Sequence, residues 1–170
     1  MTPQLSETEF IQIISKNQGI IHKVCNMYCN DVDDRKDLFQ EIVIQLWKSY
    51  NTFRGDAKFT TWIYRVALNI AISAYRKESR RPEKTDLEDI SFKIAEEVQD
   101  PEKEAKFRLL EDSIKQLSEI ERAIVMMYLD EYSSEEIAET VGITSNNVRV
   151  RMNRIKEKLR KMMTPHLVKE

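Results

Sequence analysis

Apolar residues recur every three or four positions along most of this chain, which is the spacing that lines one face of an α-helix. Ile21, Val24, Cys25 and Tyr28 form one such stripe. Only three glycines and four prolines occur among the 170 residues, so few positions favour tight turns or break helices. The sequence therefore predicts an all-α protein.

Capping signals divide this pattern into separate helices. Ser6 and Glu9 form a capping box, which predicts a short helix that Gly19 interrupts. A second helix then carries the stripe described above, and a third follows the "NDVDD" loop and runs to about Tyr50. A fourth helix is expected to begin near Phe59. The first half of the chain is thus expected to be helical almost throughout.

The helical pattern fades near the middle of the chain. Pro82 stops the fourth helix, and the residues from Glu83 to about Asp100 are acidic, polar and weakly periodic. Asp100 and Pro101 have the types of an N-cap and a first helical residue, and the apolar face that follows is Phe107, Leu110, Ile114 and Leu117. The expected organisation is two small helical domains joined by an acidic flexible linker, with bounds 1–82, 83–100 and 101–170.

The net charge of −2 hides an uneven distribution of charged residues. Residues 58–84 carry seven basic and two acidic side chains, and residues 145–170 carry eight and two. Residues 85–112, in contrast, carry four basic and ten acidic side chains. Two compact basic segments in an acidic chain are typical of local phosphate contact rather than of general affinity for polyanions.

The third predicted helix has an unusual polar face. On a helical wheel, Asp37, Gln40, Glu41 and Ile44 lie opposite the apolar arc, with Trp47 at the border. An exposed apolar pair surrounded by carboxylates suggests a docking surface for a partner helix. A solvated helix face with one stray isoleucine explains the pattern equally well.

The fourth predicted helix has apolar residues on two sides and one narrow polar strip. Arginine can contact phosphate, asparagine can read a base edge, and tryptophan can stack on an unpaired base, so the strip could hold a nucleic-acid strand. In the alternative, the tryptophan is a core residue and the arginines are ordinary surface charges, because aromatic residues at helical spacing are usually core. The strip consists of Thr61, Arg65, Asn69, Ser73 and Arg76, and Trp62 lies at its edge.

The C-terminal part of the chain has the signature of a helix-turn-helix. Ser133 opens a capping box, Gly142 follows as a turn, and Thr144 or Ser145 caps the last helix. The last helix is expected to lie in a major groove, and a plain helical hairpin with a basic tail is the alternative. Its outward face is Asn146, Asn147, Arg149, Val150, Asn153 and Arg154.

Two long segments resemble parts of a known family. "DLFQEIVIQLWKSYNTFRGDAKFTTWIYRVALNIAISAYRK" resembles region two of a bacterial sigma factor, and "YSSEEIAETVGITSNNVRVRMNRIKEKLRK" resembles region four. The chain is similar to the small, two-domain extracytoplasmic-function (ECF) group of the sigma-70 family. The resemblance implies a protein that binds core RNA polymerase and directs it to promoters, and that is not an enzyme.

The resemblance also implies which residues contact the polymerase. In the family, the "DLxQE" helix docks on the clamp coiled coil of the largest polymerase subunit. This implicates Asp37, Gln40 and Glu41, in agreement with the helical wheel, which adds Ile44 and Trp47 to the expected docking surface.

Region two of the family recognises and melts the minus-10 element of promoter DNA. The aromatic residue of "TW", the following arginine and the asparagine at this spacing engage the melted non-template strand, and the "FRGDAKF" loop forms a pocket for a flipped-out base. The residues thereby expected to contact the minus-10 DNA are Phe53, Lys58, Thr61, Trp62, Arg65, Asn69 and Arg76.

Region four of the family reads the minus-35 element as duplex DNA. The residues expected to do so here are Ser145, Asn146, Asn147, Arg149, Val150, Asn153 and Arg154. Many relatives have a small residue and threonine in place of Asn146 and Asn147, and serine in place of Val150, so the minus-35 sequence stays open. The acidic residues 85–104 resemble the segment that threads toward the polymerase active-site channel, and a solvated tether explains them equally well.

His22, Cys25 and Cys29 could place three metal ligands along one helix, or the cysteines could form a redox switch. However, Cys25 lies on the predicted core stripe, a fourth ligand is not evident, and cysteines on consecutive turns are poorly placed for a disulfide. Neither a metal site nor a cofactor is expected.

Other classes of function explain less of the sequence. A stand-alone helix-turn-helix regulator accounts for the C-terminal half but not for the polar faces of the third and fourth helices. An enzyme would need a nucleophile–base pair, a phosphate-binding glycine loop or paired histidine ligands, and none is evident. The first residues read as neither signal peptide nor membrane span, so a cytoplasmic location is expected. By the resemblance, an anti-sigma factor is an expected partner.

Overall fold

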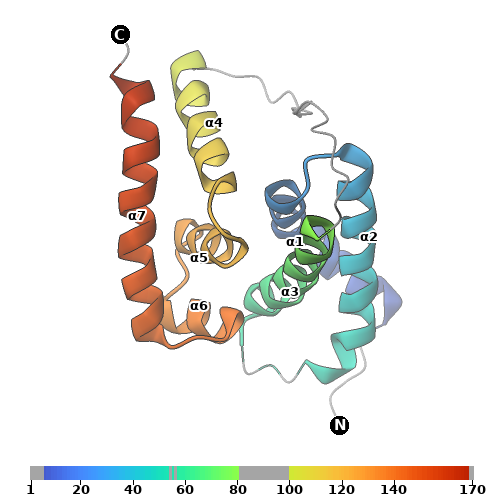
Figure 1. Cartoon of the computed structure of the whole chain (residues 1–170). Coiled ribbons are helices and arrows are strands. Elements are labelled where there is room, and N and C mark those ends of the chain that lie inside the picture. Colours follow the sequence, from blue (N-terminus) through green and yellow to red (C-terminus); the bar gives the residue numbers. More distant parts are fainter. Residues whose placement is uncertain (1–5, 54, 56, 81–99, 169–170) are drawn as a thin grey trace. The chain divides into compact units, whose positions relative to one another are not determined.

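The computed structural model describes residues 6–53, 55, 57–80 and 100–168. Every regular element within these ranges is a helix, so the predicted all-α fold is confirmed (Figure 1). The chain divides into two compact units, the first with α1 to α3 and the second with α4 to α7. The elements are α1 (Glu7–Tyr28), α2 (Val32–Ser49), the 3-10 helix η1 (Tyr50–Thr52), α3 (Phe59–Ser79), α4 (Pro101–Lys115), α5 (Glu119–Leu129), α6 (Ser134–Val141) and α7 (Ser145–Leu167).

The domain bounds at residues 82 and 100 stay predictions, because residues 81–99, which hold nearly all of the predicted linker, lie outside the described ranges. Among the helices that are described, none combines the length and the apolar character that crossing a membrane requires.

The first unit consists of α1, α2 and α3, and each of these helices packs against both others. Ile42 and Leu46 of α2 and Ile63 and Leu68 of α3 are at most 1% exposed. Burial of an aliphatic side chain of this size contributes about 1.5–3 kcal/mol relative to leaving it in water. The core of this unit therefore lies where the apolar faces of all three helices meet.

Gly19 does not interrupt the first helix, contrary to the sequence prediction. It lies within α1, which continues unbroken to Tyr28. An exposed glycine inside a helix costs only about 1 kcal/mol relative to alanine. Phe10 and Ile14 before it and Ile21 after it are buried on one continuous face, and the packing of that face outweighs the cost.

The second unit is organised around α7, which packs on α4, α5 and α6. Val148, Met152, Ile155 and Leu159 recur at helical spacing along α7, and all four are buried. Phe107, in contrast, was expected on the inward face of α4 and is 60% exposed. The reason is that α4 is buried only near its C-terminal end, at Ser113 and Ile114.

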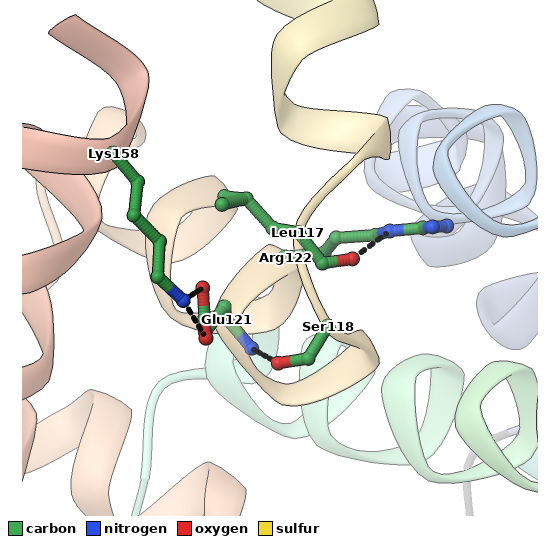
Figure 2. A network of polar contacts seen from close by, with 5 residues as sticks. All are labelled: Leu117, Ser118, Glu121, Arg122 and Lys158. Atoms are coloured by element: carbon green, nitrogen blue, oxygen red, sulfur yellow. Dashed lines mark hydrogen bonds and ion pairs between the residues drawn. The ribbon is translucent and has the colours of Figure 1, made fainter. Parts of the chain in front are cut away.

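A buried arginine fixes the junction between α4 and α5 (Figure 2). Arg122 is 7% exposed, its Nε donates to the carbonyl oxygen of Leu117 at 3.0 Å, and a terminal nitrogen donates to that of Lys115. Both carbonyls lie at the C-terminal end of α4, where backbone acceptors are unpaired and the helix dipole is negative. Glu121, the preceding residue, accepts hydrogen bonds from Lys158 Nζ at 2.7 and 3.1 Å and so joins α5 to α7.

Two glycines allow a matched test of backbone strain. Gly142 has a φ of +77°, whereas Gly19 is helical, and a Cβ at either position would meet no atom within 4 Å. We expect Gly142→Ala to lower the free energy of unfolding of the second unit by about 1 kcal/mol, because an L-residue is strained in the left-handed region. Gly19→Ala should raise the value for the first unit by up to about 1 kcal/mol.

Hydrogen exchange in mild denaturant, followed at amides of α1 and of α6 and α7 in the full chain, measures both changes. Changes of the same sign in the two variants would contradict the assigned backbone conformations.

Candidate protein-docking and nucleic-acid interfaces

The polar face of α2 is exposed as predicted. Ile44 is 54% exposed and Trp47 is 46% exposed, although the opposite face of the helix is buried. The Trp47 ring also makes an edge contact with Phe10 of α1, at a centroid distance of 4.9 Å. The carboxylates and the amide expected around this apolar pair, Asp37, Gln40 and Glu41, are exposed as well. The surface combines apolar area with carboxylates, which suits a basic or mixed partner helix.

The polar strip of α3 is present, but it is shorter than predicted. Arg65, Asn69 and Arg76 are exposed, as is Lys58, which is the N-cap residue of α3. Thr61 is only 5% exposed, so the expectation that it lies on the open strip is wrong. Its side chain lies in the first turn of α3, where aromatic rings from η1 and the following loop pack, and its Oγ1 has no hydrogen-bond partner among the described residues.

Three aromatic rings meet at the start of α3. Phe53 lies 5.0 Å from Phe59 and 5.3 Å from Trp62, and Phe59 lies 5.3 Å from Trp62, measured between ring centroids. Tyr50 contacts Phe59 and Trp62 at 6.5 and 6.4 Å. Phe53 and Trp62 are half-buried, so Trp62 is neither a full core residue nor a freely exposed ring. Each of these two rings retains exposed surface on which an unpaired base could stack.

A groove of about 520 Å³ runs between α2 and α3. Glu41, an expected docking residue, and Asn69, an expected DNA contact, both line it, so the two predicted surfaces adjoin. Gln45, Ser49 and Lys77 also line the groove and were not among the predicted site residues. The sequence spacing shows that each wall is one face of a helix, because its residues form a row at i, i+4 and i+8, but it does not show that the two faces meet. The rows are Glu41, Gln45 and Ser49 on α2, and Asn69, Ser73 and Lys77 on α3.

The helix-turn-helix in the second unit is formed by α6 and α7. Gly142 ends α6 in the left-handed conformation, and Thr144 rather than Ser145 caps α7, because its Oγ1 accepts the Asn147 N–H at 3.1 Å. Ser145 and Asn147 are half-buried. The residues of the predicted reading face that are exposed are Asn146, Arg149, Val150, Asn153 and Arg154.

Two arginines on α7 already have partners. Arg149 forms an ion pair with Glu135 of α6 at 2.9 Å, and both side chains are more than half exposed. Arg151, which was not among the predicted residues, donates to Asn147 Oδ1 at 3.2 Å. An exposed ion pair contributes about 0–1 kcal/mol, so Arg149 can exchange Glu135 for a phosphate or a base at little cost.

Cys25 lies in the core of the first unit, and Cys29 is half-buried. Cys25 is 2% exposed, and burial, reinforced by Cys29, raises the pKa of its thiol to about 12. The His22 ring stacks on Phe39 with a centroid distance of 4.6 Å. The part of the chain that the structure describes contains no group of three or more histidine, cysteine or acidic residues placed to hold a metal ion.

The burial of Thr61 can be tested with an isosteric variant. Thr61→Val should raise the free energy of unfolding of the first unit by about 1 kcal/mol, because it removes a buried hydroxyl without a partner. It should leave binding to melted minus-10 DNA unchanged, whereas a direct DNA contact through the hydroxyl would make the variant bind more weakly. Chemical unfolding and titration with a melted promoter fragment and core polymerase measure the two quantities.

The reactivity of Cys25 follows from its pKa. With the pKa raised from 9.0 to about 12, its thiolate fraction at pH 8 is about a thousandfold smaller than that of an ordinary thiol. We expect iodoacetamide to modify Cys25 much more slowly in the folded chain than in the urea-unfolded chain, because the raised pKa lowers the thiolate fraction and burial hinders access of the reagent. Mass spectrometry of the fragments distinguishes it from Cys29, and equal rates in the folded and unfolded chains would disprove its burial.

Comparison with known families gives two matches within this chain. The family model of sigma-70 region 2 matches residues 13–81, and that of sigma-70 region 4 matches residues 107–159. The first match covers α2, η1 and α3, and the second covers α5 and α6 and most of α7. The polar face of α2 and the polar strip of α3 thus lie in region 2, and the helix-turn-helix lies in region 4.

Similar solved structures include the sigma factor RpoE in complex with the anti-sigma factor NepR from Bartonella quintana, with a TM-score of 0.68, 16% identity and coverage of 95% of this chain and 99% of that chain. CnrH in complex with the cytosolic domain of CnrY also has a TM-score of 0.68, with 18% identity and coverage of 94% and 90%. At these identities the likeness supports the fold alone.

Two relatives found by sequence have higher identities to this chain than these solved structures have. The ECF RNA polymerase sigma-E factor of Haemophilus influenzae is 30% identical over 167 residues, which cover 92% of this chain and 88% of that protein. The ECF RNA polymerase sigma-E factor of Escherichia coli (strain K12) is 31% identical over 157 residues, which cover 85% and 82%. The chain therefore belongs to the ECF group of the sigma-70 family, the RNA polymerase sigma factors that carry regions 2 and 4 for promoter recognition.

Proposed function

We propose that the first unit joins core polymerase to the minus-10 element, with the polymerase on α2 and the melted strand on α3. The observation that supports this most directly is the groove whose lining includes both Glu41 and Asn69. The two surfaces adjoin within one packed unit, so a strand held on α3 lies beside the docked polymerase. The proposed core contacts are Asp37, Gln40, Glu41, Ile44 and Trp47.

The proposed work of α3 is to capture a strand that has already separated. Arg65, Arg76 and Lys58 neutralise phosphates, Asn69 reads a base edge, and Trp62 with Phe53 stacks against an unpaired base. Unstacking a base costs a few kcal/mol, and stacking on an aromatic side chain returns about 1–3 kcal/mol of that. Capture of this kind draws on binding energy, and a sigma factor is not an enzyme.

We propose that α7 reads the minus-35 element in the major groove. Its exposed N-terminal part offers amide groups for base edges at Asn146 and Asn153 and cations for phosphates at Arg149 and Arg154. Val150 is 41% exposed and could contact a thymine methyl group. The half-buried Ser145 and Asn147 complete the proposed set, with their backbone near the helix N-terminus, where anions bind.

The same chain is proposed to act in the cytoplasm and to be held by an anti-sigma factor. The location follows from the partner, since core polymerase and promoter DNA must both be accessible. The anti-sigma factor is supported by the solved relative that is bound to NepR. Such a partner would pack against the exposed side chains of Ile44 and Trp47, which are also proposed to contact polymerase.

Binding to purified core RNA polymerase, followed by transcription from a promoter library, tests the proposal. Tight association with selective initiation would support it and reveal the promoter sequence. Duplex binding by the chain without association with polymerase would instead favour a stand-alone helix-turn-helix regulator.

The separate roles proposed for α2 and α3 predict that core affinity and open-complex formation can be lowered by different substitutions. Gln40→Ala should weaken core binding by about tenfold, as truncation of an interface residue that contributes to binding typically does. Asn69→Ala should reduce open-complex formation and leave core affinity intact. Titration with core polymerase and permanganate footprinting of the promoter measure the two effects.

Two exposed residues of α1 provide matched controls. Gln18→Ala and Asn26→Ala make the same chemical changes away from both surfaces, and they should alter neither quantity. If Gln40→Ala and Asn69→Ala weakened core binding equally, the proposed division would be wrong.

A further inference from the structure

The half-buried ring of Phe59 is the one member of the three-ring contact to which no role has been given above. It contacts Phe53 at 5.0 Å with the ring planes at 65°, and Trp62 at 5.3 Å with the planes at 72°. Both are edge-to-face arrangements, which are the favourable geometry for aromatic pairs. The two partners are the rings proposed to stack on an unpaired minus-10 base.

The position of Phe59 in the chain explains what these contacts do. Phe59 is the first residue of α3, and Trp62 follows three positions later on the same side of the helix. Phe53 precedes the loop that leads into α3, so the contact between Phe53 and Phe59 joins the two ends of that loop. The Phe59 ring therefore contacts both Phe53, which precedes the loop, and Trp62 in the first turn of α3.

We infer that Phe59 is a positioning residue for capture of the minus-10 base, an inference that rests on the function proposed above for Phe53 and Trp62. It acts through these two rings and presents them as a preformed stacking site. Without the Phe59 ring, Trp62 gains rotamers, and Phe53 keeps only its contact with Trp62 to hold it against α3. Capture of a base must then fix both rings in one conformation. The conformational entropy that is lost in this step lowers the yield of open complexes.

The contacts of Phe59 distinguish this role from general core packing. The fully buried residues of α3, such as Ile63 and Tyr64, face the apolar sides of α1 and α2. Phe59 instead retains exposed surface, and all the aromatic partners of its ring lie in η1, the following loop and the first turn of α3, within the part of the chain that is described.

The experiment replaces Phe59 and a matched phenylalanine. Phe59→Leu keeps an apolar side chain and removes the ring, Phe59→Tyr keeps the ring, and Phe39→Leu makes the same change at a half-buried position of the same unit whose ring stacks on His22. The full chain is bound to core polymerase, and open complexes are measured on the strongest promoter recovered from the library. Phe59→Met replaces the leucine variant if that variant does not fold.

The expected result is that Phe59→Leu lowers open-complex formation by about tenfold, because the variant loses all three aromatic pairs of the ring, and changes core affinity by less than about twofold. Phe59→Tyr and Phe39→Leu should keep open-complex formation close to that of the unaltered chain. A decrease of the same size in Phe39→Leu would overturn the inference, because it would mean that general loss of packing is responsible.

A spectroscopic measurement on the free chain tests the positioning itself. In a Trp47→Phe background, the near-ultraviolet circular dichroism of tryptophan comes from Trp62 alone. Phe59→Leu should remove most of this signal and Phe39→Leu should not, and an unchanged signal in Phe59→Leu would overturn the inference.

Failure of the inference and failure of the proposed function are distinguishable. If Trp62→Ala lowers open-complex formation and Phe59→Leu does not, only the positioning role is wrong. If Trp62→Ala and Phe53→Ala both leave it unchanged, the proposed minus-10 site is wrong, and the role of Phe59 is overturned with it.

Discussion

The packing of α3 against both α1 and α2 is the constraint on which the rest of the first unit depends. Ile63, Tyr64, Ala67 and Ala71 have no exposed surface at all. A helix that is buried on two sides has little freedom to rotate or slide, because each residue step of about 100° would place a polar side chain in the core. The apolar contacts of α3 therefore decide which of its polar side chains face solvent, and through them where a strand can bind.

Repeating patterns within one helix were predictable from the sequence. In α2, the same 3.6-residue repeat that places Leu38, Ile42 and Leu46 inside places Ile44 outside, so the exposed docking face follows from a helical wheel. Caps were equally readable, because an N-cap hydrogen bond involves residues only two or three positions apart, as at Ser133 and Thr144. For the same reason the helix-turn-helix was predicted with its turn at Gly142.

Contacts between elements were not predictable in this way. Thr61 shares a wheel arc with Arg65, yet it is buried, because it lies one helical turn before Tyr64 and two before Leu68, which are both buried in α3. Phe107 continues an apolar stripe, yet the described helices bury α4 only near its C-terminal end, at Ser113 and Ile114. The groove between α2 and α3 requires two helices to lie side by side, and neither row of polar residues indicates by itself which row it faces.

In the proposed complex, where Arg149 contacts a phosphate, its ion pair with Glu135 changes how many counterions the second unit releases on DNA. Each cation that replaces condensed ions on duplex DNA steepens the salt dependence of binding by about 0.9 in the logarithmic slope. An arginine that leaves a carboxylate of its own protein exposes that carboxylate to solvent, and the carboxylate then recruits a cation from solution. The number of phosphate contacts derived from the salt dependence of binding to a minus-35 duplex would therefore be smaller than the number of phosphates that the protein contacts. Glu135 thus acts as a counterion carried by the protein itself.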